Sequence, residues 1–183
     1  MARGVTFKAS LNTAGLNRYL NKLGDEAEAA LRPAAQAGAQ VLYDRVKANV
    51  GAIGKKTGKL SASIYQAYSV SNSEDGKAAV YHVSWNARKA PHGHLLEYGY
   101  LQRYRYYQGD DGQIRPMVRP GMDGKPRPGR RAPQAQKNAY YVTLPFPVWV
   151  APRAFVRNAE SEFSAAYKAA TAELKRRVLS KTT

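Results

Sequence analysis

Residues 25–50, DEAEAALRPAAQAGAQVLYDRVKANV, decide the fold because their spacing predicts a long helix. Apolar or small side chains recur at every third or fourth position, as on one face of a helix: Leu31, Ala35, Gly38, Leu42, Val46 and Val50. Asp25 is suited to cap the first turn, and a shorter helix is expected over residues 14–23. Pro33 has no amide hydrogen, so we expect a kink there or a short helix that ends at Arg32.

The C-terminal segment, residues 153–179, is predicted to form a second helix. Its apolar stripe consists of Phe155, Ala159, Phe163, Ala166/Tyr167, Ala170, Leu174 and Val178. Three segments between the helices have strand composition: residues 63–71, 78–86 and 139–150. The predicted fold class is α+β, in which a small, mainly antiparallel sheet packs against the long N-terminal helix and the C-terminal helix.

Composition excludes several classes of protein. The chain has 183 residues and 44% hydrophobic residues, which suits a single domain over residues 1–183. It contains no cysteine, so a disulfide scaffold, a thiolate metal site and a cysteine nucleophile are excluded. No apolar run approaches the roughly 20 residues of a membrane span, and residues 1–4 lack the apolar start of a signal peptide. We therefore expect no contact with a membrane.

The basic charge is concentrated in part of the chain. The formal net charge is +16, and residues 101–138 contribute +6 of it, whereas residues 61–100 are neutral. Residues 101–138 also contain 5 Pro and 5 Gly, so this segment is predicted to be an inserted basic arm that buries no core of its own. Asp111-Gly112 predicts a small hairpin within the arm. The charge implies a polyanionic partner or neighbour.

Tyrosine and arginine are interleaved in residues 100–107, at the start of the arm. Such side chains pack across protein interfaces, stack on nucleic-acid bases, or form an ordinary strand surface. The candidate interface or DNA-channel residues are Arg103, Tyr104, Arg105, Tyr106, Tyr107, Arg115, Arg119, Lys125, Arg127, Arg130 and Arg131.

Catalytic and metal-binding patterns are weak. Residues 51–59 form a basic, glycine-rich loop, but Leu60 stands where a phosphate-binding loop needs Ser or Thr, which favours a plain connection. His92, His94 and Glu97 carry metal-ligating groups, but their spacing matches no helical histidine motif, which favours a surface turn with a structural carboxylate. We therefore predict no enzyme, no catalytic residue, no metal and no cofactor.

Three short motifs occur in a characteristic order: residues 56–64 (KTGKLSASI), 94–99 (HLLEYG) and 151–159 (APRAFVRNA). This order resembles the HK97 gp10-like family of tailed-bacteriophage proteins, which are tail-completion or head–tail neck components. The resemblance covers roughly residues 25–100 and 139–180. The chain departs from the family pattern where Ala154 separates Pro from Phe, where Tyr100 replaces Thr, and in the length of the arm.

The resemblance implies a structural virion protein that forms a ring, most often a hexamer, between the tail and the head connector. The implied partners are the head connector or adaptor, the tail tube or terminator proteins and, through non-specific contact, the genomic DNA in the channel. The implied location is the tail or neck of the virion, and the host cytoplasm during assembly.

The resemblance also gives structural or inter-subunit roles to Gly58, Glu97, Tyr98, Gly99 and Phe155. Glu97 stands among apolar residues and needs a partner, for which we expect an arginine of a neighbouring subunit. The alternative function is that of a sequence-independent nucleic-acid-binding protein, which the same basic charge would support.

Overall fold

The computed structural model describes residues 14–54 and 57–180. Residues 1–4, where we expect no signal peptide, and residues 55–56 of the glycine-rich connection lie outside the described residues. The helices are α1 (Ala14–Ile53), α2 (Lys59–Ser63), α3 (Gly93–Tyr98), α4 (Gln134–Tyr140) and α5 (Phe163–Ser180), with 3₁₀ helices η1 (Val70–Asn72) and η2 (Arg157–Glu162).

The long helix α1 is one element. It continues through Gly24 and Pro33, so the expected separate helix over residues 14–23 and the break at Arg32 are both wrong. A proline removes one hydrogen bond from a helix, and packing of neighbouring turns can offset that loss. Ala30 and Ala34, on either side of Pro33, are both buried and provide such packing.

The C-terminal helix begins later than expected. Its first turns, which the sequence places in an α-helix, form η2 instead, and α5 begins at Phe163. A 3₁₀ helix turns by about 120° per residue against about 100° in an α-helix, so η2 rotates the apolar stripe by about a third of a turn. Phe163 and Tyr167, which we placed on that stripe, are therefore exposed, whereas Ala166 is buried.

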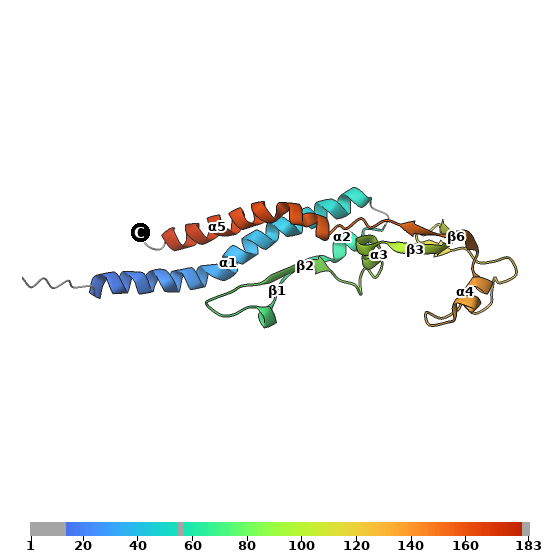
Figure 1. Cartoon of the computed structure of the whole chain (residues 1–183), viewed down its shortest axis with the longest axis horizontal. Helices are drawn as coiled ribbons and strands as arrows, with labels where there is room; N and C mark the ends of the chain where they lie inside the picture. The colour runs from blue at the N-terminus through green and yellow to red at the C-terminus, as the bar shows by residue number, and fades with distance from the viewer. Residues whose placement is uncertain (1–13, 55–56, 181–183) are drawn as a thin grey trace, which may run out of the picture. The chain divides into compact units, whose positions relative to one another are not determined.

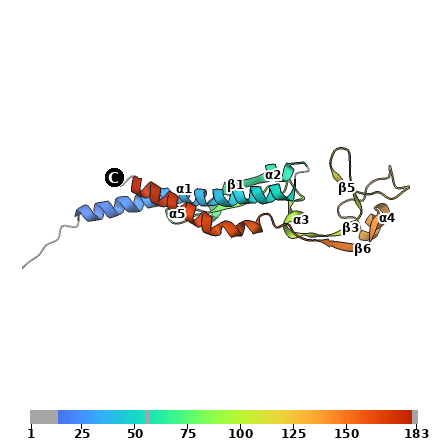
Figure 2. The same ribbon diagram turned by 90° about the horizontal axis from the view of Figure 1, so that it is seen from above.

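The chain divides into two compact units. Among the described residues, unit 1 comprises residues 14–41, 67–82 and 164–180, and unit 2 comprises residues 42–66 and 83–163. In unit 1, the first part of α1 and α5 lie side by side (Figures 1 and 2). The helices approach closely at Gly38, where an added Cβ would lie 2.9 Å from the carbonyl oxygen of Ala166. The small residues on this face of α1 therefore pack against another helix.

The strands form three two-stranded sheets. The pairs are β1 (Ile64–Tyr68) with β2 (Tyr81–Trp85), β3 (Tyr100–Tyr104) with β6 (Thr143–Val150), and β4 (Tyr106–Gln108) with β5 (Ile114–Pro116). The α+β class and the hairpin predicted at Asp111-Gly112 are confirmed, but the expected single sheet is wrong. The third predicted strand, β6, pairs with β3, which we had assigned to the arm. Pro145 and Pro147 lack the amide hydrogens that a central strand needs, so β6 cannot join two sheets.

The core of unit 2 surrounds Phe155, whose side chain is fully buried. The ring of Trp85 meets it edge-on, with the ring centroids 5.3 Å apart. The other buried members of this cluster are Val46, Val50, Leu60, Ile64, Ala90 and Ala159. None of the residues from 101 to 139 is buried, so the core is built entirely from the segments before and after them.

Candidate assembly surface

Glu97 forms a buried anchor between α3 and the segment before η2. The residue is almost completely buried, with a relative exposure of 1%. One carboxylate oxygen, Oε2, accepts a hydrogen bond from the backbone N–H of Val156 at 2.9 Å. The other, Oε1, accepts from the backbone N–H and from Nε of Arg157, both at 3.1 Å. The partner of Glu97 is thus Arg157 of the same chain, and not the arginine of a neighbouring subunit that we expected.

The anchor also fixes the residues around it. The backbone N–H groups of Arg153 and Ala154 both donate to the carbonyl oxygen of Leu96, and the guanidinium of Arg157 lies 5.1 Å from the ring centroid of Tyr98. Ala154 adopts a φ of 46°, a left-handed conformation that L-residues rarely take. The extra residue between Pro152 and Phe155 is therefore accommodated by a strained turn that still seats Phe155 in the core.

Two predicted glycines have positive φ angles. Gly58 has a φ of 71° and precedes α2, and Gly99 has a φ of 77° and connects α3 to β3. A Cβ at Gly99 would lie 2.7 Å from the carbonyl oxygen of Val150. Gly99 therefore allows β3 to begin directly beside the end of β6.

The β3–β6 pair, here called the ribbon, contains a bulge. Tyr100, Leu101 and Gln102 face Val150, Trp149 and Val148 in regular antiparallel register, but Tyr104 faces Thr143. Residues 144–147 (LPFP) therefore stand opposite Arg103 alone. A bulge leaves amide groups without ladder partners, and two of these four residues are prolines, which have no amide hydrogen.

The ribbon exposes large apolar side chains. Phe146, within the bulge, is 80% exposed, and Trp149 is 61% exposed. Leu101 lies directly opposite Trp149, so the two side chains share one face of the ribbon, and Val148 is exposed on the other face. We call Leu101, Phe146, Val148 and Trp149 the apolar set of the ribbon. A pair of exposed apolar side chains on one face, such as Leu101 and Trp149, is typical of an interaction surface.

Tyr104, an interface candidate, has a structural role. Its hydroxyl donates to Oδ1 of Asn138 at 3.0 Å and accepts from Nε2 of Gln134 at 2.6 Å, so it connects β3 to α4. Tyr106 and Tyr107 remain partly exposed on β4. Partial burial, with further contributions from neighbouring tyrosines, raises the pKa of the Tyr106 hydroxyl, which keeps it neutral.

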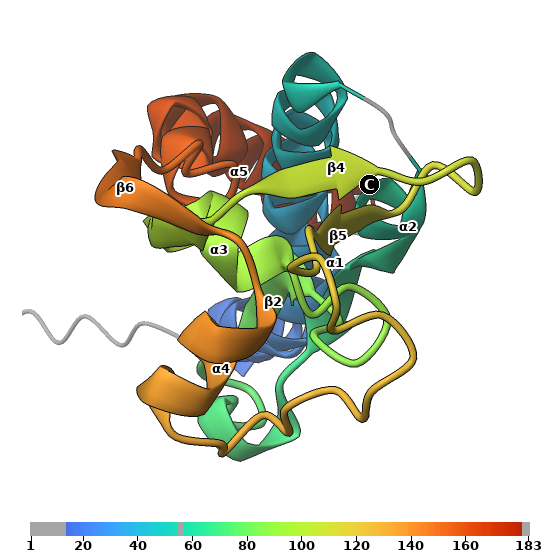
Figure 3. The ribbon, with the colours of Figure 1, turned by 90° about the vertical axis from the view of Figure 1, so that its right-hand side faces the viewer.

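Two of the arginine candidates are also held within the arm. Arg115 pairs with Asp111 across the turn of the β4–β5 hairpin, which Figure 3 shows together with α4. Nε of Arg119 donates to the carbonyl oxygens of Asn138 and Tyr141, at 2.9 and 3.0 Å. Both side chains therefore stabilise the fold of the arm, and their contact with a partner stays a prediction.

The remaining cationic candidates have side chains that are available to bind a partner. Their side chains are exposed, and within the described residues they make no hydrogen bond or ion pair: Arg103, Arg105, Lys125, Arg127, Arg130 and Arg131. Four of them lie in residues 125–131 (KPRPGRR), which we call the basic loop.

The structure does not bring the metal-ligating residues together. Glu97 turns toward Val156 and Arg157, whereas Nδ1 of His94 bonds to the carbonyl oxygen of Pro91. Burial, with the nearby charge of Lys59, lowers the pKa of His92. Across residues 14–54 and 57–180, no three His, Asp or Glu side chains are grouped so that they can hold a metal ion.

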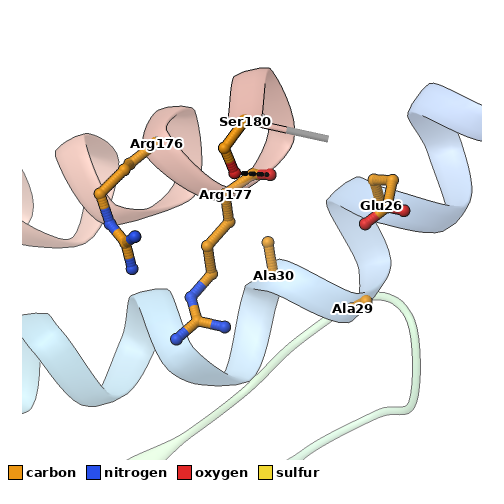
Figure 4. Close-up of a pocket in the computed structure, with 6 residues that line it drawn as sticks. All are labelled: Glu26, Ala29, Ala30, Arg176, Arg177 and Ser180. Carbon is orange, nitrogen blue, oxygen red and sulfur yellow. Dashed lines mark hydrogen bonds between the residues drawn. The ribbon is translucent and has the colours of Figure 1, made fainter. Parts of the chain in front are cut away.

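A pocket in unit 1 lies between α1 and α5 (Figure 4). Its lining residues are Glu26, Ala29, Ala30, Arg176, Arg177 and Ser180. Arg176 and Arg177 both hydrogen-bond to the carboxylate of Glu173, and these bonds lower the pKa of Glu173 to about 2. Since both guanidinium groups are already paired, we assign this pocket to helix packing. No helix in the described part of the chain is both long and apolar enough to cross a membrane.

Sequence reasoning missed the apolar set and the pairing of Glu97 with Arg157. The prolines of residues 144–147 were a signal of irregularity, but they do not reveal which way Phe146 points. Arg157 lies within the motif of residues 151–159, 60 positions from Glu97, and no local pattern connects the two.

Comparison with known proteins supports the resemblance over the first two motifs, residues 56–64 and 94–99. One protein family, described as "Bacteriophage HK97-gp10, putative tail-component", matches residues 14–99. The match ends before β3, so residues 139–180, to which we extended the resemblance, lie outside it. No curated protein and no solved structure matches the chain. Over residues 14–99, the chain is similar to the HK97-gp10-like family of bacteriophage tail components.

Proposed function

We propose that this tail component is a tail-completion or neck protein that joins the phage tail to the head connector. The observation that carries the proposal is the ribbon, which exposes Leu101, Phe146 and Trp149 next to the segment that matches the family. A two-stranded ribbon is marginally stable by itself and gains stability when a face is covered. A joining protein needs such a surface to bind its neighbours.

In this proposal, the ribbon of one copy packs on a different surface of the next copy. A contact between unlike surfaces closes into a ring when the rotation between copies is a whole fraction of a turn. We propose a hexamer, located in the tail or neck of the virion and assembled in the host cytoplasm. The ring would contact the head connector or adaptor on one side and the tail tube or terminator on the other.

The proposed role is structural and not enzymatic. The buried carboxylate of Glu97, paired with the partly exposed Arg157, holds backbone groups of its own chain in place. Such a pair positions the core and the start of the ribbon but presents no group to a substrate. This supports a scaffold whose activity is assembly.

Native mass spectrometry and electron microscopy test the proposal. We expect a ring mass for the purified chain, and monomers for the variant Phe146→Ser/Trp149→Ser, because it removes the two most exposed members of the apolar set. The matched control is Phe163→Ser/Tyr167→Ser, which removes two similarly exposed aromatic side chains from α5 and should still form rings. In infected cells, the ribbon variant should leave heads and tails unjoined.

A different result would contradict the proposal. A wild-type chain that stays monomeric, together with normal joining of heads and tails in its absence, would exclude the joining role. Equal loss of rings in the ribbon variant and in the control would show that the ribbon is not the contact surface.

A further inference from the structure

Over the part of the chain that the structure describes, the cationic side chains of the basic loop are unpaired, unlike Arg115 and Arg119 elsewhere in the arm. Arg115 and Arg119 are occupied by Asp111 and by backbone carbonyls. In contrast, the four cations of the loop are exposed and make no side-chain bond within the described residues: Lys125, Arg127, Arg130 and Arg131. The chain has no acidic residue between Asp123 and Glu160 that is available to neutralise them.

The backbone of the loop is held in place from α4. The hydroxyl of Tyr140, a buried side chain, donates to the carbonyl oxygen of Lys125 at 3.0 Å. Nζ of Lys137 donates to the carbonyl oxygen of Arg130 at 2.8 Å. Pro126 and Pro128 further restrict the residues that precede them. Both anchors bond to carbonyl oxygens, so they fix the chain and leave the cationic side chains free.

The chemistry of the loop suits phosphate groups. Guanidinium groups bind phosphate oxygens through paired hydrogen bonds, and cations held in a fixed order lose less conformational freedom on binding. Residues 120–133 contain no aromatic side chain on which an unpaired base can stack, which favours a duplex over a single strand. They also contain no Asn or Gln with which to read adenine.

We propose that the basic loop binds the phosphate backbone of duplex DNA without reading its sequence. Contacts to phosphates alone position DNA but do not select a site on it. The inference rests on the proposed function only in naming the source of the DNA. In a neck protein, that DNA would be the phage genome in the channel. The ability of the loop to bind a duplex is a property of the isolated chain.

The experiment is a salt titration by fluorescence anisotropy with a labelled duplex of about 30 base pairs, from about 50 to 200 mM salt. The test variant is Lys125→Gln/Arg127→Gln/Arg130→Gln/Arg131→Gln. The matched control is Arg88→Gln/Lys89→Gln/Lys168→Gln/Lys175→Gln, which removes the same net charge from exposed positions elsewhere. Circular dichroism of both variants checks that each retains the helix content of the wild type.

Each phosphate contact contributes about 0.9 to the slope of log affinity against log salt, so the loop variant should reduce the slope by about 3 to 4. Its affinity at the lowest salt should fall at least about tenfold, whereas the control should lose less than about threefold. The single variant Asp123→Asn, which removes the acidic group nearest the loop in sequence, should bind more tightly than the wild type.

Four outcomes would overturn the inference. They are no measurable binding by the wild type, equal loss in the loop variant and the control, tighter binding of a single strand than of the duplex, and displacement of DNA by polyglutamate at equal charge. The last outcome would indicate an acidic protein as the partner. Any of these outcomes, if rings still form, would overturn the DNA-binding inference and leave the proposed joining function in place. Loss of rings with intact DNA binding would overturn the joining function and leave the DNA-binding inference in place.

Discussion

At the scale of single residues, Glu97 shows how a buried charge is made tolerable. Its two carboxylate oxygens receive three hydrogen bonds, two from backbone N–H groups and one from the guanidinium of Arg157. Backbone donors cannot move away, so the loss of the negative charge leaves them facing a poorer acceptor.

The variant Glu97→Gln tests this account. The amide places an N–H₂ group where an acceptor is needed, so we expect the free energy of unfolding to fall by about 2–4 kcal/mol. Urea denaturation measures the change. The control Glu160→Gln, on an exposed side chain of η2, should change it by less than about 0.5 kcal/mol. An unchanged midpoint for Glu97→Gln would mean that Arg157 and the backbone find other partners.

Two glycines of α1 should respond to the same substitution in opposite ways. Gly24 has no heavy atom within 4 Å of an added Cβ, so Gly24→Ala should raise the free energy of unfolding by about 0.5–1 kcal/mol. At Gly38 the added Cβ would lie 2.9 Å from a backbone oxygen of α5, so Gly38→Ala should lower it by about 1–3 kcal/mol. Thermal melts of both variants measure the difference, and stabilisation by Gly38→Ala would contradict the helix contact.

At the scale of elements, η2 determines which face of α5 is buried. The sequence predicted continuous α-helical spacing over residues 153–179, which put Phe163 on the apolar stripe. Because η2 rotates that stripe, Phe163 is 60% exposed. The spacing of apolar residues predicts that a helix exists, because it depends only on residues three or four positions apart. It does not predict a change of helix type, which depends on the packing of Phe155 and Ala159 in the core of unit 2.

Two phenylalanines at either end of η2 should therefore differ in their effect on stability. We expect Phe155→Ala to lower the free energy of unfolding by about 3–5 kcal/mol because its side chain is fully buried. Phe163→Ser should lower it by less than about 1 kcal/mol. Chemical denaturation compares the two variants. A large loss for Phe163→Ser would show that the stripe passes through this position after all.

The end of α5 should lose an interaction only in strong acid. Hydrogen bonds from Arg176 and Arg177 lower the pKa of Glu173 from 4.5 to about 2. Because the pKa is lowered in the folded state, the ion pairs contribute fully to the free energy of unfolding above pH 4.5. This contribution is lost as the pH falls through about 2. The difference in melting temperature between wild type and Glu173→Gln should accordingly be constant near neutral pH and vanish near pH 2. A difference that vanishes already at pH 4.5 would exclude the pairing.

At the scale of the whole molecule, the sequence predicted the two helices and the β4–β5 hairpin but not the contacts between distant segments. The periodicity of α1 and the turn residues of β4–β5 act over a few positions, so they can be read directly. The pairing of β3 with β6 joins segments about 40 positions apart, and many such pairings satisfy the same composition. Likewise, the charge of Arg119 is visible in the sequence, but its use as a structural anchor is not.

A shortened chain tests whether the arm folds onto an independent core. Tyr104 and Thr143 are paired across the ribbon, so residues 105–142 can be replaced by Asn-Gly, a two-residue turn. Since the core cluster lies outside these residues, we expect cooperative unfolding with a melting temperature within about 5 °C of the wild type. Removal of residues 101–138 instead deletes β3 and should be more damaging. A shortened chain without cooperative unfolding would refute the inserted-arm interpretation.

The prolines of the ribbon bear on how copies would associate in the proposed ring. An open strand edge beside exposed aromatic residues is a template for strand addition, which continues from copy to copy into fibres. Pro145 and Pro147 have no amide hydrogen, so β6 cannot form a continuous ladder with an incoming strand through these residues. Association through the ribbon would then depend on packing of side chains and not on backbone pairing. Side-chain packing defines one rotation between neighbouring copies, and this rotation limits the number of copies in a closed assembly.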